Sequence, residues 1–145
     1  MRKLLLVVAM LLMVAGPASA QYWNVNPGPG GNLGPWPLLT DVATGTGESV
    51  DCKNGLDFIQ FYVIWGSGTS AGAVQLETSD VDASTGRCTY TGRWAPLGVP
   101  IAWSAASKTD WQQILAPSRC VRARVSTAVV PGTVRVRAYG IPRAR

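Results

Sequence analysis

One stretch near the end of the chain, residues 118–140, restricts the possible folds more than any other. Apolar and polar side chains alternate along residues 121–126 and again along residues 133–139, on the two sides of a Pro-Gly dipeptide. A period of two is typical of a β-strand with one buried face, and a short break between two such runs favours an antiparallel hairpin. The expected inward positions are Val121, Ala123 and Val125 before the break, and Val134, Val136 and Ala138 after it. A shift of one residue would turn all of them to water, so the pattern also specifies the register.

Strand signals separated by turns continue through the preceding part of the chain. Residues 57–65 are apolar on both faces, which predicts a central strand, and residues 73–79 alternate, which predicts a half-exposed strand. A returning strand is expected at residues 87–94, and a single helical turn near residues 110–115. Many short strands without a convincing helix predict an all-β protein, an antiparallel β-sandwich of immunoglobulin-like or jelly-roll type, over residues 49–142.

Two segments precede this predicted domain. Residues 1–20 combine a basic start, a run of twelve apolar residues and a small-residue end, which predicts a secretory signal peptide. A membrane span needs about 20 apolar residues, so a membrane anchor is the weaker alternative. Residues 21–48 begin with a stretch rich in Gly and Pro and are predicted to form an extended N-terminal arm. Tyr22, Trp23 and Trp36 would anchor this arm on the domain or on a neighbour, unless the arm is only a linker.

The chain has three cysteines, Cys52, Cys88 and Cys120, and no histidine. In the oxidising compartment that a leader implies, one disulfide and one remaining thiol are expected, and spacing alone allows three pairings. In an immunoglobulin-like order all three cysteines lie at one end of the sandwich, and we favour a disulfide between Cys88 and Cys120. The lack of histidine argues against Ser-His-Asp and Cys-His catalysis and removes the commonest zinc ligand.

Oxygen-bearing side chains at alternate positions, Asp80, Asp82 and Ser84, resemble the start of a calcium-binding loop. The pattern fails further on, because Thr91 stands where a bidentate glutamate is required. The alternative is a polar hairpin tip in which these residues provide turn geometry. We therefore expect no cofactor, with this weak calcium candidate as the only metal site to test. The remaining carboxylates are interpreted as solvated loop acids, because none is placed in a pair suited to glycosidase chemistry.

Seven arginines lie between residues 119 and 145 without an acidic residue among them, which predicts one positive end of the fold. In the expected hairpin, Arg122, Arg124, Arg135 and Arg137 share one exposed face. Like charges opposed across strands cost up to about 1 kcal/mol, which an acidic neighbour, an anionic polymer or simply water and salt would offset. Protection of a sheet edge with the arginines solvated, contact with an acidic subunit and binding of an anionic polymer remain three open explanations.

Trp103 and Trp111, with Asp110, Gln112 and Gln113, form a set of aromatic and amide side chains of the kind that holds sugars. Six tryptophans are many for one small domain. Packing in the core and anchoring of the arm would account for most of them. The two tryptophans are therefore candidates for a carbohydrate-binding surface, with burial as the alternative.

Five segments of the chain follow an order known from another group of proteins. They are Trp-Gly-Ser-Gly-Thr from residue 65, Gly-Ala-Val-Gln-Leu-Glu-Thr-Ser-Asp from residue 72, Trp-Ala-Pro-Leu from residue 94, Val-Arg-Ala-Arg-Val-Ser from residue 121 and Gly-Thr-Val-Arg-Val-Arg from residue 132. This order resembles that of small β-sandwich proteins of tailed-phage virions. The resemblance implies a non-catalytic building or display module. A secretory leader and a longer segment at residues 81–92 depart from that pattern.

These observations predict an exported, non-enzymatic structural or attachment module that works through assembly or surface binding. The expected partners are copies of the chain itself, another surface or virion protein, or an anionic polymer or carbohydrate. No membrane span is expected once the leader is removed. The alternative function is a secreted carbohydrate-binding module that uses exposed Trp103 and Trp111.

Overall fold

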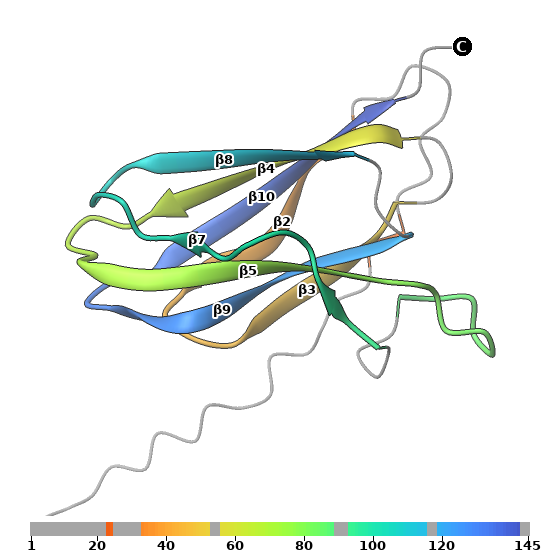
Figure 1. Ribbon diagram of the computed structural model, residues 1–145, viewed down its shortest axis with the longest axis horizontal. Coiled ribbons are helices and arrows are strands. Elements are labelled where there is room, and N and C mark those ends of the chain that lie inside the picture. The colour runs from red at the N-terminus through yellow and green to blue at the C-terminus, as the bar shows by residue number, and fades with distance from the viewer. Residues whose placement is uncertain (1–22, 25–32, 53–55, 89–92, 116–118, 143–145) are drawn as a thin grey trace, which may run out of the picture.

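The alternating stretch supplies two strands of a β-sandwich, β9 (Cys120–Val130) and β10 (Val134–Pro142). The structure, a computed structural model, describes residues 23–24, 33–52, 56–88, 93–115 and 119–142, and this part of the chain contains no helix (Figure 1). The other strands are β1 (Trp23–Asn24), β2 (Leu33–Val42), β3 (Thr46–Asp51), β4 (Leu56–Trp65), β5 (Ala71–Ser79), β6 (Ala95–Pro96), β7 (Ile101–Ala102) and β8 (Thr109–Leu115).

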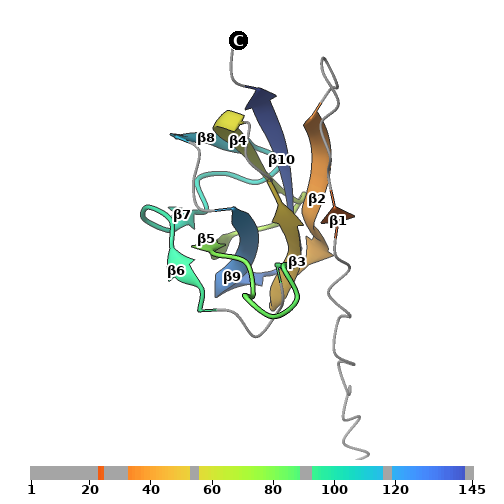
Figure 2. The same ribbon diagram turned by 90° about the vertical axis from the view of Figure 1, so that its right-hand side faces the viewer.

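The strands form two sheets that pack face to face (Figure 1, Figure 2). The four-stranded sheet has the order β2-β10-β4-β8, and the six-stranded sheet has the order β1-β3-β9-β5-β6, with β7 also paired to β5. Among the described strands only β1 runs parallel to its neighbour. From β2 to β5, and again from β8 to β10, every connection carries the chain to the opposite sheet. This strand order is the jelly-roll form of the predicted β-sandwich.

The predicted hairpin between β9 and β10 is wrong, although both strands exist with the expected inward faces. Val121 of β9 and Val134 of β10 are each 0% exposed. However, β9 pairs with β3 and β5, whereas β10 pairs with β2 and β4 in the other sheet. The Pro-Gly break is therefore a crossing between sheets. Alternation shows which face of a strand is buried, and that pattern is the same whether the next strand lies beside it or across the core.

The core lies between the two sheets and receives side chains from all the long strands. Trp65 and Phe61 of β4 are 1% and 0% exposed, and they belong to one cluster with Leu38 of β2 and Leu76 of β5. The expected central strand is confirmed, because β4 lies between β10 and β8. Close packing between the two inner faces holds the backbone of each strand in place, and with it the outward side chains.

The boundary between the predicted arm and the domain is wrong, because residues 21–48 include β2 and the start of β3. Trp36 is 6% exposed and belongs to the core, so it anchors on its own domain. The prolines in β2 are compatible with a strand because β2 lies at the edge of its sheet. The predicted leader and Tyr22 lie outside the described residues.

Three further local predictions differ from the structure. Gln75 and Glu77 of β5 are 5% and 6% exposed, so this strand is buried on both faces instead of half-exposed. The segment predicted as a helical turn is the edge strand β8, which pairs with β4 over its whole length. The predicted returning strand at residues 87–94 lies partly outside the described residues, and its described ends are not strand. No helix in the described part of the chain is long and apolar enough to cross a membrane.

Candidate binding surface

The four arginines of the alternating stretch do not share one face, which corrects the sequence-based expectation. Arg122 and Arg124 lie on the outer side of β9, and Arg135 and Arg137 lie on the outer side of β10. Because β9 and β10 belong to opposite sheets, the whole thickness of the sandwich separates the two pairs. Each pair therefore has its own surroundings and must be judged separately.

Part of the outer face of the six-stranded sheet is covered by the chain that follows β5, at the end of the sheet that carries Glu77 and Cys120. We call the described parts of that chain, residues 80–88 and 93–98, the covering segment. Gln75 Nε2 on the outer side of β5 donates a hydrogen bond to the Gly98 carbonyl oxygen over 3.3 Å. The covering segment explains why polar side chains on this side of β5, such as Glu77, are buried.

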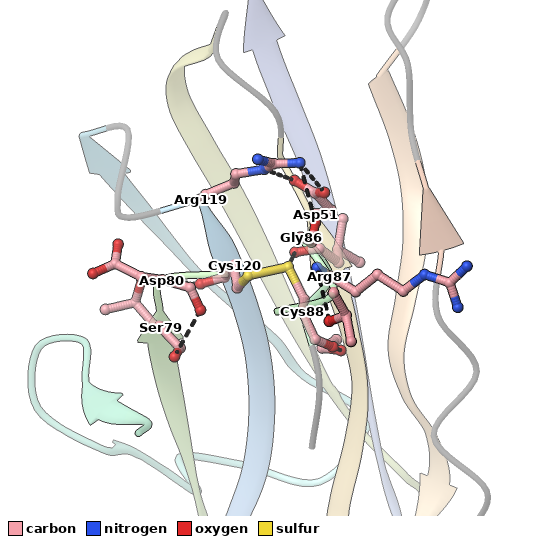
Figure 3. The surroundings of a disulfide bond; sticks show 12 residues. Asp51, Ser79, Asp80, Gly86, Arg87, Cys88, Arg119 and Cys120 are labelled. Carbon is pink, nitrogen blue, oxygen red and sulfur yellow. Dashed lines mark hydrogen bonds and ion pairs between the residues drawn. A yellow bond between two sulfur atoms is a disulfide. The ribbon is translucent and has the colours of Figure 1, made fainter. Parts of the chain in front are cut away.

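A disulfide between Cys88 and Cys120 ties the covering segment to β9, which confirms the predicted pairing (Figure 3). Beside it, the Arg119 guanidinium group forms two hydrogen bonds with the carboxylate of Asp51, over 2.8 and 2.9 Å. Cys52 is the remaining free cysteine, at the same end of the sandwich as predicted, and it is buried. Burial, and then the neighbouring Asp51 carboxylate, raise the pKa of the Cys52 thiol to about 12.

The arginines on β9 are offset by an acid of the same domain. Arg122 Nε lies 2.7 Å from Glu77 Oε2, and Arg124 Nε lies 2.8 Å from Glu77 Oε1. The Arg122 guanidinium group also lies over the Trp94 ring, 4.1 Å from its centre, in a cation–π contact. Glu77 thus bridges both arginines: the Arg122 side chain, 11% exposed, lies against Trp94 of the covering segment, whereas the Arg124 side chain is 41% exposed. Both charges are therefore balanced by an acid of the same domain.

The calcium candidate at Asp80, Asp82 and Ser84 forms a turn. Asp82 Oδ1 accepts hydrogen bonds from the Ser84 amide (2.8 Å), the Thr85 amide (3.0 Å) and the Ser84 hydroxyl. The Ser84 hydroxyl, followed by these amides, lowers the pKa of Asp82. In the described residues no group of three or more His, Cys, Asp and Glu side chains is placed to hold a metal ion. The carboxylate of Asp82 therefore caps the loop, as the alternative interpretation expected.

The two candidate tryptophans differ in how far they are buried. Trp103 is partly buried and packs against the core, whereas Trp111 on β8 is 63% exposed. Gln113 points to the same outer side as Trp111, while Asp110 and Gln112 take the inner side of β8 by alternation. Trp103 and Trp111 therefore do not form one sugar-binding platform, and only Trp111 remains available on the surface.

The outer side of the four-stranded sheet carries a group of aromatic, amide and guanidinium side chains. Alternation directs them outward, because the intervening residues Phe61, Val63 and Ala138 are 0% exposed. We call the following six residues the aromatic face: Gln60 and Tyr62 of β4, Trp111 and Gln113 of β8, and Arg137 and Tyr139 of β10.

Strand pairing orders the aromatic face into two rows that run across the sheet. In one row Tyr62 lies between Arg137 and Trp111, its partners on the two neighbouring strands. The Tyr62 ring also meets the Tyr139 ring edge to face, with the ring centres 5.3 Å apart. Such a pair limits the motion of both rings. The second row consists of Tyr139, Gln60 and Gln113.

The two arginines of β10 have different partners. Arg135 forms an ion pair with Asp41 at the end of β2. Arg137 lies between Pro37 and Tyr62 on the neighbouring strands, neither of which carries a charge. No carboxylate in the described part of the chain forms an ion pair with Arg137. The aromatic face therefore carries one positive charge without a counter-charge of its own.

The sequence alone indicates Trp111, Gln113 and Arg137 as candidates, but not Tyr62, Tyr139 or Gln60. These three residues alternate correctly with buried neighbours, so the sequence does contain the signal that they point outward. What it lacks is the pairing of β4 with both β8 and β10, which brings them together.

Comparisons with known proteins found no relative of this chain. No family model matches it, and neither a curated protein nor a solved structure matches it. The resemblance to small β-sandwich proteins of tailed-phage virions therefore stays a prediction from the residues.

Proposed function

We propose that the protein is an exported, non-enzymatic attachment module that binds a surface through the aromatic face. The observation that carries this proposal is the contrast between the two outer faces of the sandwich. The covering segment lies on part of one of them, where Glu77 balances both arginines, whereas the other presents Trp111, 63% exposed, beside Tyr62 and Arg137. Exposed aromatic side chains and arginine, grouped in one place, are typical of residues that contribute most of the binding energy at interfaces.

Three observations support export and a role without catalysis. The disulfide is a bond that persists in oxidising compartments, in agreement with the predicted leader. The Cys52 thiol has a pKa of about 12, so it is protonated near neutral pH and is a poor nucleophile. The pKa values of Asp82 and Asp110 are lowered by hydrogen bonds, which makes both carboxylates poor proton donors at that pH.

Assembly through the same face is the main competing function. In a symmetric dimer the same patch lies on both sides of the interface. If the two-fold axis runs along the row of Arg137, Tyr62 and Trp111, stacking two aromatic faces would bring two Arg137 guanidinium groups together, and the six residues of each face include no acid to neutralise them. This charge argument disfavours that arrangement of two copies. Because Trp111 is exposed, carbohydrate binding remains one specific form of the proposed attachment function.

The test measures attachment and assembly on the same samples. Protein purified from expression of the full chain is sedimented with envelope material of the producing cells, and its mass in solution is measured by light scattering. We expect Trp111→Ala to weaken co-sedimentation by about tenfold or more. An aromatic side chain that becomes buried at the centre of an interface typically contributes over about 1.4 kcal/mol to binding. Val99→Ala is the matched control, since Val99 is 78% exposed but lies outside the aromatic face. A wild type that does not co-sediment, or a Trp111→Ala variant that co-sediments equally well, contradicts the proposal.

A further inference from the structure

We infer that the aromatic face binds an acidic polysaccharide, a chain of sugar rings that carry carboxylate groups, and that Arg137 binds the carboxylate. This inference rests on the proposed attachment function and names the chemistry of the surface. Three features of the face support it: the spacing of the side chains along one row, the unbalanced charge and the mixture of ring and amide groups.

The first feature is the row formed by Arg137, Tyr62 and Trp111. These residues occupy three adjacent strands, each the direct cross-strand partner of the next. Adjacent strands lie about 4.8 Å apart, so the row extends over about 10 Å from the first backbone to the third. One pyranose ring advances a polysaccharide by a length close to the strand spacing. A sugar chain that lies across the strands therefore meets a new side chain of the row at each ring.

The second feature is charge. Arg137 has no ion-pair partner among the described residues, and the six residues of the aromatic face include no acid. A guanidinium group presents two parallel N–H donors that match the two oxygens of a carboxylate. The same group on β9 already has its acid, because Glu77 pairs with Arg122 and Arg124. A carboxylate from outside the chain can thus pair with Arg137, whereas the arginines of β9 already have their acid.

The third feature is the alternation of apolar and polar groups over the face. A sugar ring has C–H groups on its two sides and hydroxyl groups around its rim. The rings of Trp111 and Tyr62 provide surfaces for the C–H groups, and the amides of Gln60 and Gln113 in the next row provide donors and acceptors for the hydroxyls. A purely apolar partner would leave these amides without hydrogen bonds, at a cost for each. The face therefore fits a sugar chain better than a lipid surface or an apolar protein surface.

The experiment compares two polymers that differ only in charge: polygalacturonate, and the same polymer with its carboxylates fully methyl-esterified. Their affinities for the protein purified from the full chain are measured by affinity electrophoresis and calorimetry. We expect the wild type to bind polygalacturonate about tenfold or more tightly than the ester, because the paired hydrogen bonds between a guanidinium group and a carboxylate are stronger than those to a neutral ester. Added salt should narrow this difference, since it screens an exposed charge pair.

Three variants assign the binding to the face. Arg137→Gln should reduce the affinity for polygalacturonate to that of the ester, while Trp111→Ala should weaken binding of both polymers by about tenfold. Arg93→Gln is the matched control, because it removes the same charge from an exposed position on the covering segment, next to Trp94. We expect this control to change either affinity by less than about twofold, as is usual for a charge outside the contact.

Several outcomes would overturn the inference. Equal affinity of the wild type for the acid and the ester, or equal losses in Arg137→Gln and Arg93→Gln, would remove Arg137 as the carboxylate-binding residue. A wild type that binds neither polymer, yet co-sediments with envelope material through Trp111, would contradict the polysaccharide while the attachment function stands. A dimer that dissociates in Trp111→Ala and binds no polymer would identify a second copy as the occupant of the face.

Discussion

Asp110 joins the edge strand β8 to the core through a single carboxylate. Its Oδ2 atom accepts hydrogen bonds from Trp65 Nε1 over 2.8 Å and from the Ser104 hydroxyl over 2.7 Å, and its Oδ1 atom lies 3.2 Å from Lys108 Nζ. Burial opposes ionisation of Asp110, but the bonds from Ser104, Trp65 and Lys108 outweigh it and keep its pKa below the ordinary value. The ionised carboxylate is therefore the form that the fold stabilises.

Replacing Asp110 tests this arrangement. Trp65 is 1% exposed, so Asp110→Ala leaves a buried indole N–H without its acceptor, which should lower the free energy of unfolding by about 1–3 kcal/mol. Asp110→Asn should cost less, because the amide oxygen can still accept from Trp65. Urea denaturation followed by tryptophan fluorescence measures both. If Asp110→Ala is as stable as the wild type, the hydrogen bond to Trp65 does not contribute.

The pH dependence of the same comparison follows from the lowered pKa of Asp110. A carboxyl group whose pKa is lower in the folded state contributes stability above its unfolded pKa of about 3.9, and this contribution is lost as the pH falls through the folded value. The difference in unfolding free energy between the wild type and Asp110→Asn should therefore be largest near pH 7 and should shrink below about pH 4. A difference that stays constant from pH 7 to pH 3 would show that the charge of Asp110 has no role.

The crossing between β9 and β10 depends on a close backbone approach at one glycine. Gly132 has a φ of 102°, and a Cβ atom there would lie 2.7 Å from Thr69 Oγ1 and 3.3 Å from the Thr69 backbone nitrogen. Thr69 is 2% exposed in the loop that joins β4 to β5, so it has little room to move. The two loops that carry the chain between sheets at this end are thus packed against each other.

Substitution by alanine separates backbone strain from the close approach. Gly68 also has a positive φ, 86°, but a Cβ atom there would have no neighbour within 4 Å. Gly68→Ala should destabilise by about 1–2 kcal/mol from the backbone alone, and Gly132→Ala by roughly 1–3 kcal/mol more because of the contact with Thr69. Thermal denaturation of the two variants provides the comparison. If both variants lose the same stability, the two loops can move apart around the added methyl group without a cost in free energy.

The domain as a whole begins earlier than the composition of the chain indicates. β2 contributes Trp36, Leu38 and Leu39 to the core, at 6%, 1% and 3% exposed, and it covers one edge of β10. Loss of a large buried side chain typically costs about 2–5 kcal/mol. The combined cost of removing all three is therefore comparable to the whole free energy of unfolding of a typical domain, about 5–15 kcal/mol.

Two truncations test this boundary. A protein that begins at Leu33 retains β2 and should unfold cooperatively, whereas a protein that begins at Ser49 should lack a cooperative thermal transition in circular dichroism. Cooperative unfolding of the shorter protein would show that β2 is dispensable and would restore the predicted boundary at residue 49. Loss of the transition in both proteins would instead show that residues before 33 are required for folding.

The sequence by itself determined the fold class and the side of each long strand that faces the core. Alternation located β9 and β10 and their inward valines, because burial acts on each strand locally and leaves a period of two. The apolar run also predicted that β4 is a central strand, and it lies between β10 and β8, although only its inner face is buried against the other sheet. The disulfide between Cys88 and Cys120 was favoured, although spacing alone allowed three pairings.

Only the tertiary structure decided which strands lie side by side, and this decided the candidate site. Backbone hydrogen bonds are alike for any pair of strands, so the pattern along β9 and β10 does not specify that they join opposite sheets. That choice gives Arg122 and Arg124 an acid in Glu77, on the neighbouring strand β5, and leaves Arg137 beside Tyr62 without an acidic partner among the described residues. The aromatic face exists because long-range pairing, which no local pattern encodes, sets β8, β4 and β10 next to one another.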